Sequence, residues 1–290
     1  MVRCASRSFG DFVISHGLCD GVVEVRMASQ RSKLNLLDTL LMRNLHRTMH
    51  FLSSDMGPSA RVAILAAEER CGSFSAGLDL KVNSEILHSE EGVLASQCLG
   101  RLIGMWQDSV SSIARCRVPV IGAIHGHCIG GATSIITACD FRLCTRDATF
   151  SVREPKVGVT ADIGVLQRLP RIVGEGRARE LCFTARTFGS EEALSYGLVE
   201  RVYDDYSALL DGARKMAAEI ATNSPLAVQG TKNIMNHQSE RAVQDSLDYV
   251  RLWNAANLRC NDVEIAGKAF ASKSFPQFID YTIDPTSTSP

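Results

Sequence analysis

The sequence predicts an α/β core followed by a helical C-terminal part. Short apolar runs at 61–67 and 118–124 have the length and composition of buried strands. Segments with helical spacing of apolar residues lie between such runs, whereas helical spacing dominates from about residue 165 onward. Strands that alternate with helices are typical of an α/β sheet. The order of the segments therefore places this core first and the helices second.

The individual elements follow in chain order. Apolar and polar residues alternate over 11–30 around Asp20-Gly21, which predicts a strand hairpin. Leucines recur at helical spacing over 36–53, which predicts a helix. The segments after these predict a strand at 61–67, a helix at 92–116, a strand at 118–124, a helix at 132–139, strands at 140–144 and 149–153, and helices at 190–196, 206–222, 225–236 and 240–272.

We divide the chain into a targeting tail (1–10), a core (11–200), a helical C-terminal region (201–275) and an irregular tail (276–290). The first nine residues hold two Arg, two Ser and no acid, as a short mitochondrial presequence does. A frayed terminus is the alternative. The chain ends without the peroxisomal tripeptide. The mitochondrial matrix is therefore favoured over a peroxisome-like organelle.

Composition argues against several classes of protein. The 31 Lys and Arg nearly balance the 32 Asp and Glu, so no basic field attracts nucleic acid or an anionic membrane. No apolar run approaches the 18 residues of a transmembrane helix. The 10 cysteines contain no CxxC pair and the 7 histidines no HExxH spacing. We therefore expect reduced, buried thiols and no metal site.

Two glycine-containing turns are candidates for binding an anionic oxygen. Gly130-Gly131-Ala132 precedes a predicted helix, so the N–H of Gly131 would face a ligand at the positive helix end. A second turn, Phe74–Leu80, follows the 61–67 strand and offers the N–H of Leu78. Two such donors around one carbonyl form an oxyanion hole. Taken alone, each turn is better explained as an ordinary tight turn.

Two carboxylates, Glu154 and Asp162, follow the Gly130-Gly131-Ala132 turn in the chain. Both have apolar neighbours, and burial raises the pKa of a carboxyl toward the range useful for acid/base catalysis on carbon. Carboxylates beside an oxyanion hole can move protons next to a thioester through an enolate. The alternatives are that each lies on the surface, or that Asp162 caps the following helix.

Several motifs together resemble the enoyl-CoA hydratase/isomerase (crotonase) superfamily in order and spacing, from about residue 12 to 273. They are Phe74-Ser-Ala-Gly-Leu-Asp-Leu80, Ile121-Gly-Ala-Ile-His-Gly-His-Cys-Ile-Gly-Gly131, Ala138-Cys-Asp-Phe-Arg142, Glu154 with Gly158, and Leu166-Gln-Arg-Leu-Pro170. The resemblance implies a crotonase-like spiral of repeated β-β-α units with a helical C-terminal trimerisation region. It also implies trimers or dimers of trimers.

The resemblance further implies an acyl-CoA substrate, with CoA as part of the substrate and no separate cofactor. It places the N–H groups of Leu78 and Gly131 at the thioester oxygen. The implied CoA-binding residues are Ser75, Ala76, Gly77, Leu78, Asp79 and Gly131. Lys273 resembles a C-terminal basic residue that approaches the CoA phosphate, although a solvated lysine fits as well.

Three positions distinguish the subfamilies. Hydratases of the family use two glutamates, at the positions of Ser134 and Glu154, and this chain lacks the first. Aspartate at position 162, paired with Glu154, resembles the Δ3,5-Δ2,4-dienoyl-CoA isomerases of fatty-acid β-oxidation. Those isomerases have a third aspartate where this chain has Ser134. Serine cannot carry that charge, although its hydroxyl can form hydrogen bonds.

The isomerase pattern implies that Asp162 removes a proton from C2 and that Glu154 delivers one to C6. Other functions remain open: a Δ3-Δ2-enoyl-CoA isomerase that uses Glu154 alone, an enoyl-CoA hydratase, an inactive scaffold or an RNA-binding member. An RNA binder would need a lysine-rich helix face, and the helix predicted at 36–53 contains no lysine. Ser134 is the reason to consider an inactive scaffold.

Overall fold

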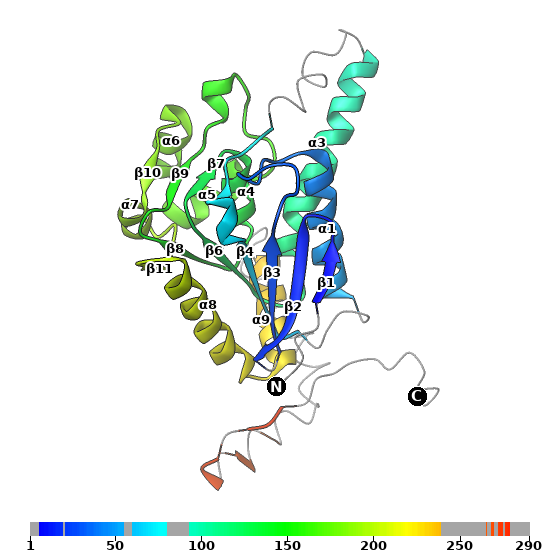
Figure 1. The fold of residues 1–290 in the computed structure, drawn as a ribbon, viewed down its shortest axis with the longest axis vertical. Coiled ribbons are helices and arrows are strands. Elements are labelled where there is room, and N and C mark those ends of the chain that lie inside the picture. The colour runs from blue at the N-terminus through cyan, green and yellow to red at the C-terminus, as the bar shows by residue number, and fades with distance from the viewer. Residues whose placement is uncertain are drawn as a thin grey trace.

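The computed structural model describes residues 6–19, 21–54, 60–79 and 93–238, together with 265, 268–269, 272–274 and 276–278. In this part of the chain the strands form two sheets, in the orders β1-β2-β3-β4-β6-β8-β11 and β10-β9-β7-β5 (Figure 1). The strands are β1 Ser6–Phe9, β2 Phe12–Cys19, β3 Val22–Met27, β4 Val62–Ala67, β5 Ser73–Ser75, β6 Val120–Ile124, β7 His127–Ile129, β8 Phe141–Thr145, β9 Thr149–Ser151, β10 Phe188–Gly189 and β11 Arg201–Tyr203.

The larger sheet begins with an antiparallel meander. Strands β2 and β3 pair antiparallel, which confirms the hairpin predicted over 11–30. Strand β1 adds a third antiparallel strand and lies within the segment 1–10. The sequence analysis did not foresee this strand. The targeting role of that segment stays a prediction.

Successive β-β-α units build the rest of the core. The first strand of each unit (β4, β6, β8) joins the larger sheet in parallel, and the second (β5, β7, β9) joins the smaller sheet in parallel. A helix follows each pair of strands, namely α3, α4 and α5. This arrangement confirms the predicted mixed α/β fold and places the ends of neighbouring β-strand pairs side by side.

The helices agree with the sequence analysis to within a few residues where the two can be compared. They are α1 Thr39–Ser53, α3 Val93–Ala114, α4 Gly131–Thr137, α5 Val165–Val173, α6 Glu175–Thr184, α7 Ser190–Ser195, α8 Tyr206–Ala221 and α9 Pro225–Gln238, with 3-10 turns η1 Glu69–Cys71 and η2 Glu154–Val157. The helix predicted at 240–272 lies almost wholly outside the described residues.

Two strands interrupt the part of the chain where only helices were expected. Strand β10 pairs with β9, and β11 pairs in parallel with β8 at the edge of the larger sheet. Strands of two and three residues are too short to show a period-2 pattern, so their partners decide them. The boundary drawn at residue 200 therefore falls beside a strand of the core sheet.

Hydrophobic packing covers both faces of the larger sheet. Along β4, Val62, Ile64 and Ala66 pack with α8, whereas Ala63, Leu65 and Ala67 belong to the cluster that contains α1 and α3. Figure 1 shows α8 on one side of the sheet and α1 with α3 on the other. Such burial on both faces explains why β4 has a continuous apolar sequence.

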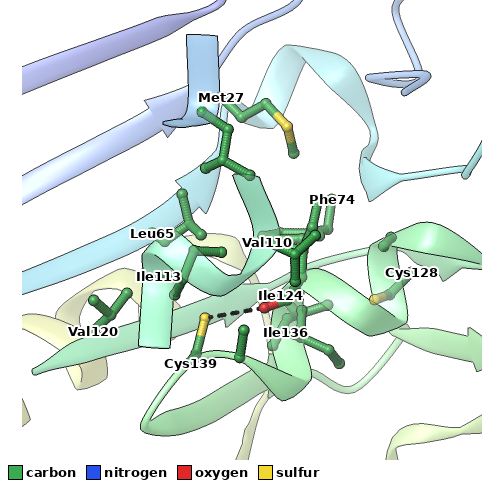
Figure 2. Close-up of a cluster of buried hydrophobic side chains, with 14 of the residues drawn as sticks. Met27, Leu65, Phe74, Val110, Ile113, Val120, Ile124, Cys128, Ile136 and Cys139 are labelled. Atoms are coloured by element: carbon green, nitrogen blue, oxygen red, sulfur yellow. Dashed lines mark hydrogen bonds between the residues drawn. The ribbon is translucent and has the colours of Figure 1, made fainter. Parts of the chain in front are cut away.

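The hydrophobic cluster that contains α1 and α3 also holds α3 against the sheet. Figure 2 shows Val110 and Ile113 of α3 among side chains from the sheet and from α4, including Leu65, Ile124 and Ile136. Val110, Ile113 and Ile124 are completely buried. Protein interiors are close-packed and allow little displacement, so the turns of α3 that carry Val110 and Ile113 form a rigid element.

Lys232 of α9 ties that helix to the core. Its buried ammonium donates to Asp140 Oδ2 at 2.7 Å and to the carbonyl of Val118 at 3.0 Å. We expect Lys232→Met to lower the free energy of unfolding by about 3 kcal/mol, because the substitution leaves a partly buried carboxylate without its cation. The exposed Lys215→Met is the matched control. Equal urea midpoints for the two variants would contradict the expectation.

Candidate active site

A cavity of about 280 Å³ opens between α3, the start of α4 and the segments that follow β5 and β9. Residues from separate segments of the chain line it: Leu37, Ala76, Gly77, Leu78, Trp106, Ile129, Gly130, Gly131, Arg153, Glu154, Val157, Val159, Asp162 and Ile163. Both predicted carboxylates and both predicted oxyanion donors are in this set. The other lining side chains are mostly apolar, so the cavity suits a hydrocarbon chain.

The N–H of Leu78 is available for a ligand. Around it, the N–H groups of Ala76 and Asp79 donate to carbonyls of Leu34 and Leu37, at 3.0 Å each. The N–H of Gly77 donates to Ser75 Oγ at 3.2 Å. These bonds anchor the turn on both sides of Leu78. In the described part of the chain the N–H of Leu78 itself forms no hydrogen bond.

The N–H of Gly131 is also available for a ligand. Gly131 is the first residue of α4, where a backbone N–H has no partner within the helix. The carbonyl of Gly130 accepts from both the N–H and the hydroxyl of Thr133, which fixes the turn. No described residue accepts from the N–H of Gly131.

The two turns are in contact. A methyl group on Gly77 would lie 2.8 Å from the carbonyl oxygen of Ile129, so the backbones approach as closely as glycine allows. Gly77 also has φ +93°, which L side chains rarely adopt. Because one turn carries Leu78 and the other carries Gly131, this contact brings both donors to one side of the cavity, as an oxyanion hole requires.

Glu154 starts the 3-10 turn η2, just after strand β9. Its carboxylate lies next to the glycine turn: a methyl group on Gly130 would be 3.7 Å from Oε1. Burial raises the pKa of Glu154, and the nearby charge of Asp162 raises it further. Oε2 is buried and has no hydrogen-bond partner within the described residues. Glu154 is therefore suited to hold a proton.

Asp162 lies on the irregular segment between η2 and α5. The helix α5 has Gly164 as its N-cap and no side-chain cap, so Asp162 does not cap it. Asp162 lines the cavity. Burial raises the pKa of Asp162 as well, although its own backbone N–H favours the ionised form. The structure thus brings together two carboxyls that stand eight positions apart in the sequence.

The remaining predicted residues lie elsewhere. Ser75 is buried and supports the Leu78 turn, and Asp79 is half-buried beside that turn. Lys273 is exposed, and neither it, Ser75, Asp79 nor Ser134 lines the cavity in the described part of the chain. Contact of Ser75, Asp79 or Lys273 with CoA stays a prediction.

Ser134 is completely buried on α4, and its hydroxyl has no hydrogen-bond partner among the described residues. We expect Ser134→Ala to keep at least half of the wild-type rate and to leave stability unchanged or raised by up to about 1 kcal/mol. The reason is that the substitution removes a polar group that gains nothing in the fold. Steady-state rates and urea midpoints check this. A tenfold loss of rate without unfolding would contradict it.

The sequence analysis missed several lining residues, including Leu37, Trp106 and Ile163. Leu37 and Ile163 close over Gly131, since a methyl group there would lie 2.8 Å and 3.2 Å from their Cδ1 atoms. Trp106 occupies a helical position whose spacing predicts burial but not a cavity. A large apolar residue next to a candidate acid, as Ile163 is, was the one available signal.

Within the described ranges, no three His, Cys, Asp or Glu side chains are grouped so that they could hold a metal ion. In the same part of the chain, no helix combines the length and hydropathy needed to cross a bilayer.

Comparisons with known proteins agree on a family. The model of the family "Enoyl-CoA hydratase/isomerase" matches residues 18–280. A protein of Dictyostelium discoideum named Delta(3,5)-Delta(2,4)-dienoyl-CoA isomerase, mitochondrial, is 42% identical over 75% of this chain and 75% of its own length. A protein of Arabidopsis thaliana named Delta(3,5)-Delta(2,4)-dienoyl-CoA isomerase, peroxisomal, is 41% identical over 78% of this chain and 82% of its own length.

A solved structure supports the same family. The enoyl-CoA hydratase of Bacillus anthracis superposes with a TM-score of 0.83 at 27% identity, covering 93% of this chain and 100% of that one. The match in sequence and the match in structure each extend over most of the chain. The chain therefore belongs to the enoyl-CoA hydratase/isomerase family of enzymes.

Proposed function

We propose that this protein is a Δ3,5-Δ2,4-dienoyl-CoA isomerase. The observation that carries the proposal is the presence of two carboxyls with raised pKa, Glu154 and Asp162, in one apolar cavity beside two available N–H groups. Two relatives with this printed name, at 42% and 41% identity, support it. A Δ3-Δ2-enoyl-CoA isomerase with one shuttling base would not need Asp162.

The reaction begins at C2 of the 3,5-dienoyl thioester. The N–H groups of Leu78 and Gly131 donate hydrogen bonds to the thioester oxygen, and Asp162 takes a proton from C2. The electron pair of the broken C–H bond passes into an extended dienolate, whose negative oxygen the two donors stabilise. Each such donor is typically worth about 3–4 kcal/mol of barrier.

The second proton transfer occurs at the far end of the dienolate. Glu154 gives its proton to C6, a new C–H bond forms, and the double bonds move from positions 3 and 5 to positions 2 and 4. Asp162 is then protonated and Glu154 ionised, so exchange with solvent restores the starting state. The two acids begin in opposite states because the charge on Asp162 favours the protonated form of Glu154.

We also propose how the substrate, the assembly and the compartment fit this reaction. CoA enters as part of the substrate, and the chemistry requires no metal or redox cofactor. We propose self-association as a trimer or a dimer of trimers through the C-terminal region, and a role in fatty-acid β-oxidation in the mitochondrial matrix. Size-exclusion chromatography with light scattering measures the assembly, and a fluorescent fusion protein reports the compartment.

The deciding experiment gives the purified protein a 3,5-dienoyl-CoA and follows the conjugated 2,4-dienoyl-CoA by ultraviolet absorbance. A 3-enoyl-CoA and crotonyl-CoA are assayed in parallel. Fast dienoyl conversion that Asp162→Asn lowers by about 10²–10⁴-fold supports the proposal. Conversion of the 3-enoyl-CoA alone, hydration of crotonyl-CoA alone, or no turnover would each reject it in favour of a single-base isomerase, a hydratase or an inactive member.

A further inference from the structure

The segment that carries Asp162 has no regular structure of its own. It runs from the end of η2 to the start of α5, and its carboxyl group accepts no hydrogen bond from another described side chain. The position of this carboxyl therefore depends on how the backbone around it is held. A shift of about 1 Å in a reacting group can cost a hundredfold in rate, so the contacts that hold this backbone affect the chemistry.

Helix α3 supplies one of those contacts. The side-chain amide of Gln107 donates from Nε2 to the backbone carbonyl of Asp162 at 2.7 Å. The two residues are 55 positions apart, and Gln107 is exposed and does not line the cavity. Gln107 thus contacts the backbone of Asp162 without lining the cavity.

A second contact from the same face of α3 reaches the first turn of α5, directly after the segment. Ser111, one turn after Gln107, accepts a hydrogen bond from Arg168 Nη2 at 2.9 Å. The guanidinium of Arg168 lies against Gly164, where a methyl group would be 1.9 Å from Nη1. Contacts one helical turn apart therefore hold both ends of the stretch from Asp162 to Arg168.

Helix α3 is a suitable support because it is rigid. Val110 and Ile113, on the same turns of the helix, are completely buried in the core cluster of Figure 2. Trp106, the neighbour of Gln107, forms part of the cavity wall. The helix that shapes the cavity is thus the helix that holds the backbone of the acid.

We infer that Gln107 is a positioning residue, which sets the place of the Asp162 carboxyl through the backbone carbonyl of Asp162. This inference rests on the proposed function, in which Asp162 takes the proton from C2. Ser111 supports the same segment through Arg168. Because Gln107 does not reach the substrate, it acts on the rate of proton transfer and not on binding.

The test is a double-mutant cycle with a matched control. Gln107→Leu keeps the size of the side chain and removes the donor, and the exposed Gln97→Leu makes the same change on the same helix. We expect Gln107→Leu to lower kcat on a 3,5-dienoyl-CoA by about 10- to 100-fold with KM within twofold. Gln97→Leu keeps the wild-type kcat. Ser111→Ala lowers kcat less, in the same direction.

The cycle separates a positioning role from a merely structural one. In the Asp162→Asn background, Gln107→Leu is expected to cause no further loss, because the carboxyl on which it acts is absent. An equal loss in both backgrounds, or a Gln107→Leu enzyme as fast as Gln97→Leu, would overturn the inference and leave the proposed function intact. Full activity of Asp162→Asn alone would instead reject the proposed function, and the inference with it.

Discussion

Glu154→Gln and Asp162→Asn, made singly, are each expected to lower dienoyl-CoA isomerisation by about 10²–10⁴-fold. Each amide keeps the shape of the side chain but can neither accept nor release the proton. KM should change little, because the donors at Leu78 and Gly131 still hold the thioester. The exposed Glu191→Gln is the control and keeps the wild-type rate. Full activity in both site variants would reject the two-acid mechanism.

The same two acids set the pH dependence of kcat. Activity requires ionised Asp162 and protonated Glu154, so it falls at low pH as Asp162 takes up a proton and at high pH as Glu154 loses one. Burial raises the pKa of both carboxyls, which moves both limbs above the ordinary range of exposed acids. The two apparent pKa values belong to the coupled pair. A flat profile across both limbs would contradict this assignment.

Gly77→Ala is expected to lower kcat by about 10²–10³-fold, the usual effect of losing one oxyanion donor. Its new methyl group would lie 2.8 Å from the carbonyl oxygen of Ile129, so the two turns must separate. Leu78 follows Gly77 directly, and its N–H then moves away from that of Gly131. Measuring kcat and KM with a 3,5-dienoyl-CoA tests this.

Gly72→Ala is the control for the strain that alanine brings. Gly72 has φ +60°, also in the left-handed region, but a methyl group there meets nothing within 4 Å. Alanine at either glycine costs about 1 kcal/mol of backbone strain, whereas only Gly77→Ala disturbs the oxyanion hole. Equal rates for the two variants would show that separating the turns does not matter.

Much of the fold was predictable because its signals are local. The continuous apolar run at 61–67 indicated a strand buried on both faces, and β4 is that strand. The alternation over 11–30 indicated the β2–β3 hairpin. The short strands β10 and β11 were not predictable, because two or three residues show no period and only their pairing with β9 and β8 makes them strands.

For the candidate site, too, the sequence indicated some features and the structure decided others. The two glycine turns and the two acids suggested oxyanion chemistry, and these residues together with the motifs at 121–131, 138–142 and 166–170 indicated the family. The sequence left open whether Asp162 caps a helix, and the structure decides this with Gly164 as the cap of α5 and Asp162 in the cavity. The sequence also could not place Ser134, which the structure shows in the core and not in the cavity wall.

By itself, the sequence determined the class of fold and the family, and it indicated two candidate acids and two candidate donor turns, because these are properties of neighbouring residues. Only the tertiary structure decided which groups share one cavity, that burial raises the pKa of both Glu154 and Asp162, and that Gln107 donates to the backbone carbonyl of an acid 55 residues away. The reason is physical. Burial and long-range contact depend on how all the elements pack together, and no local pattern of residues records that packing.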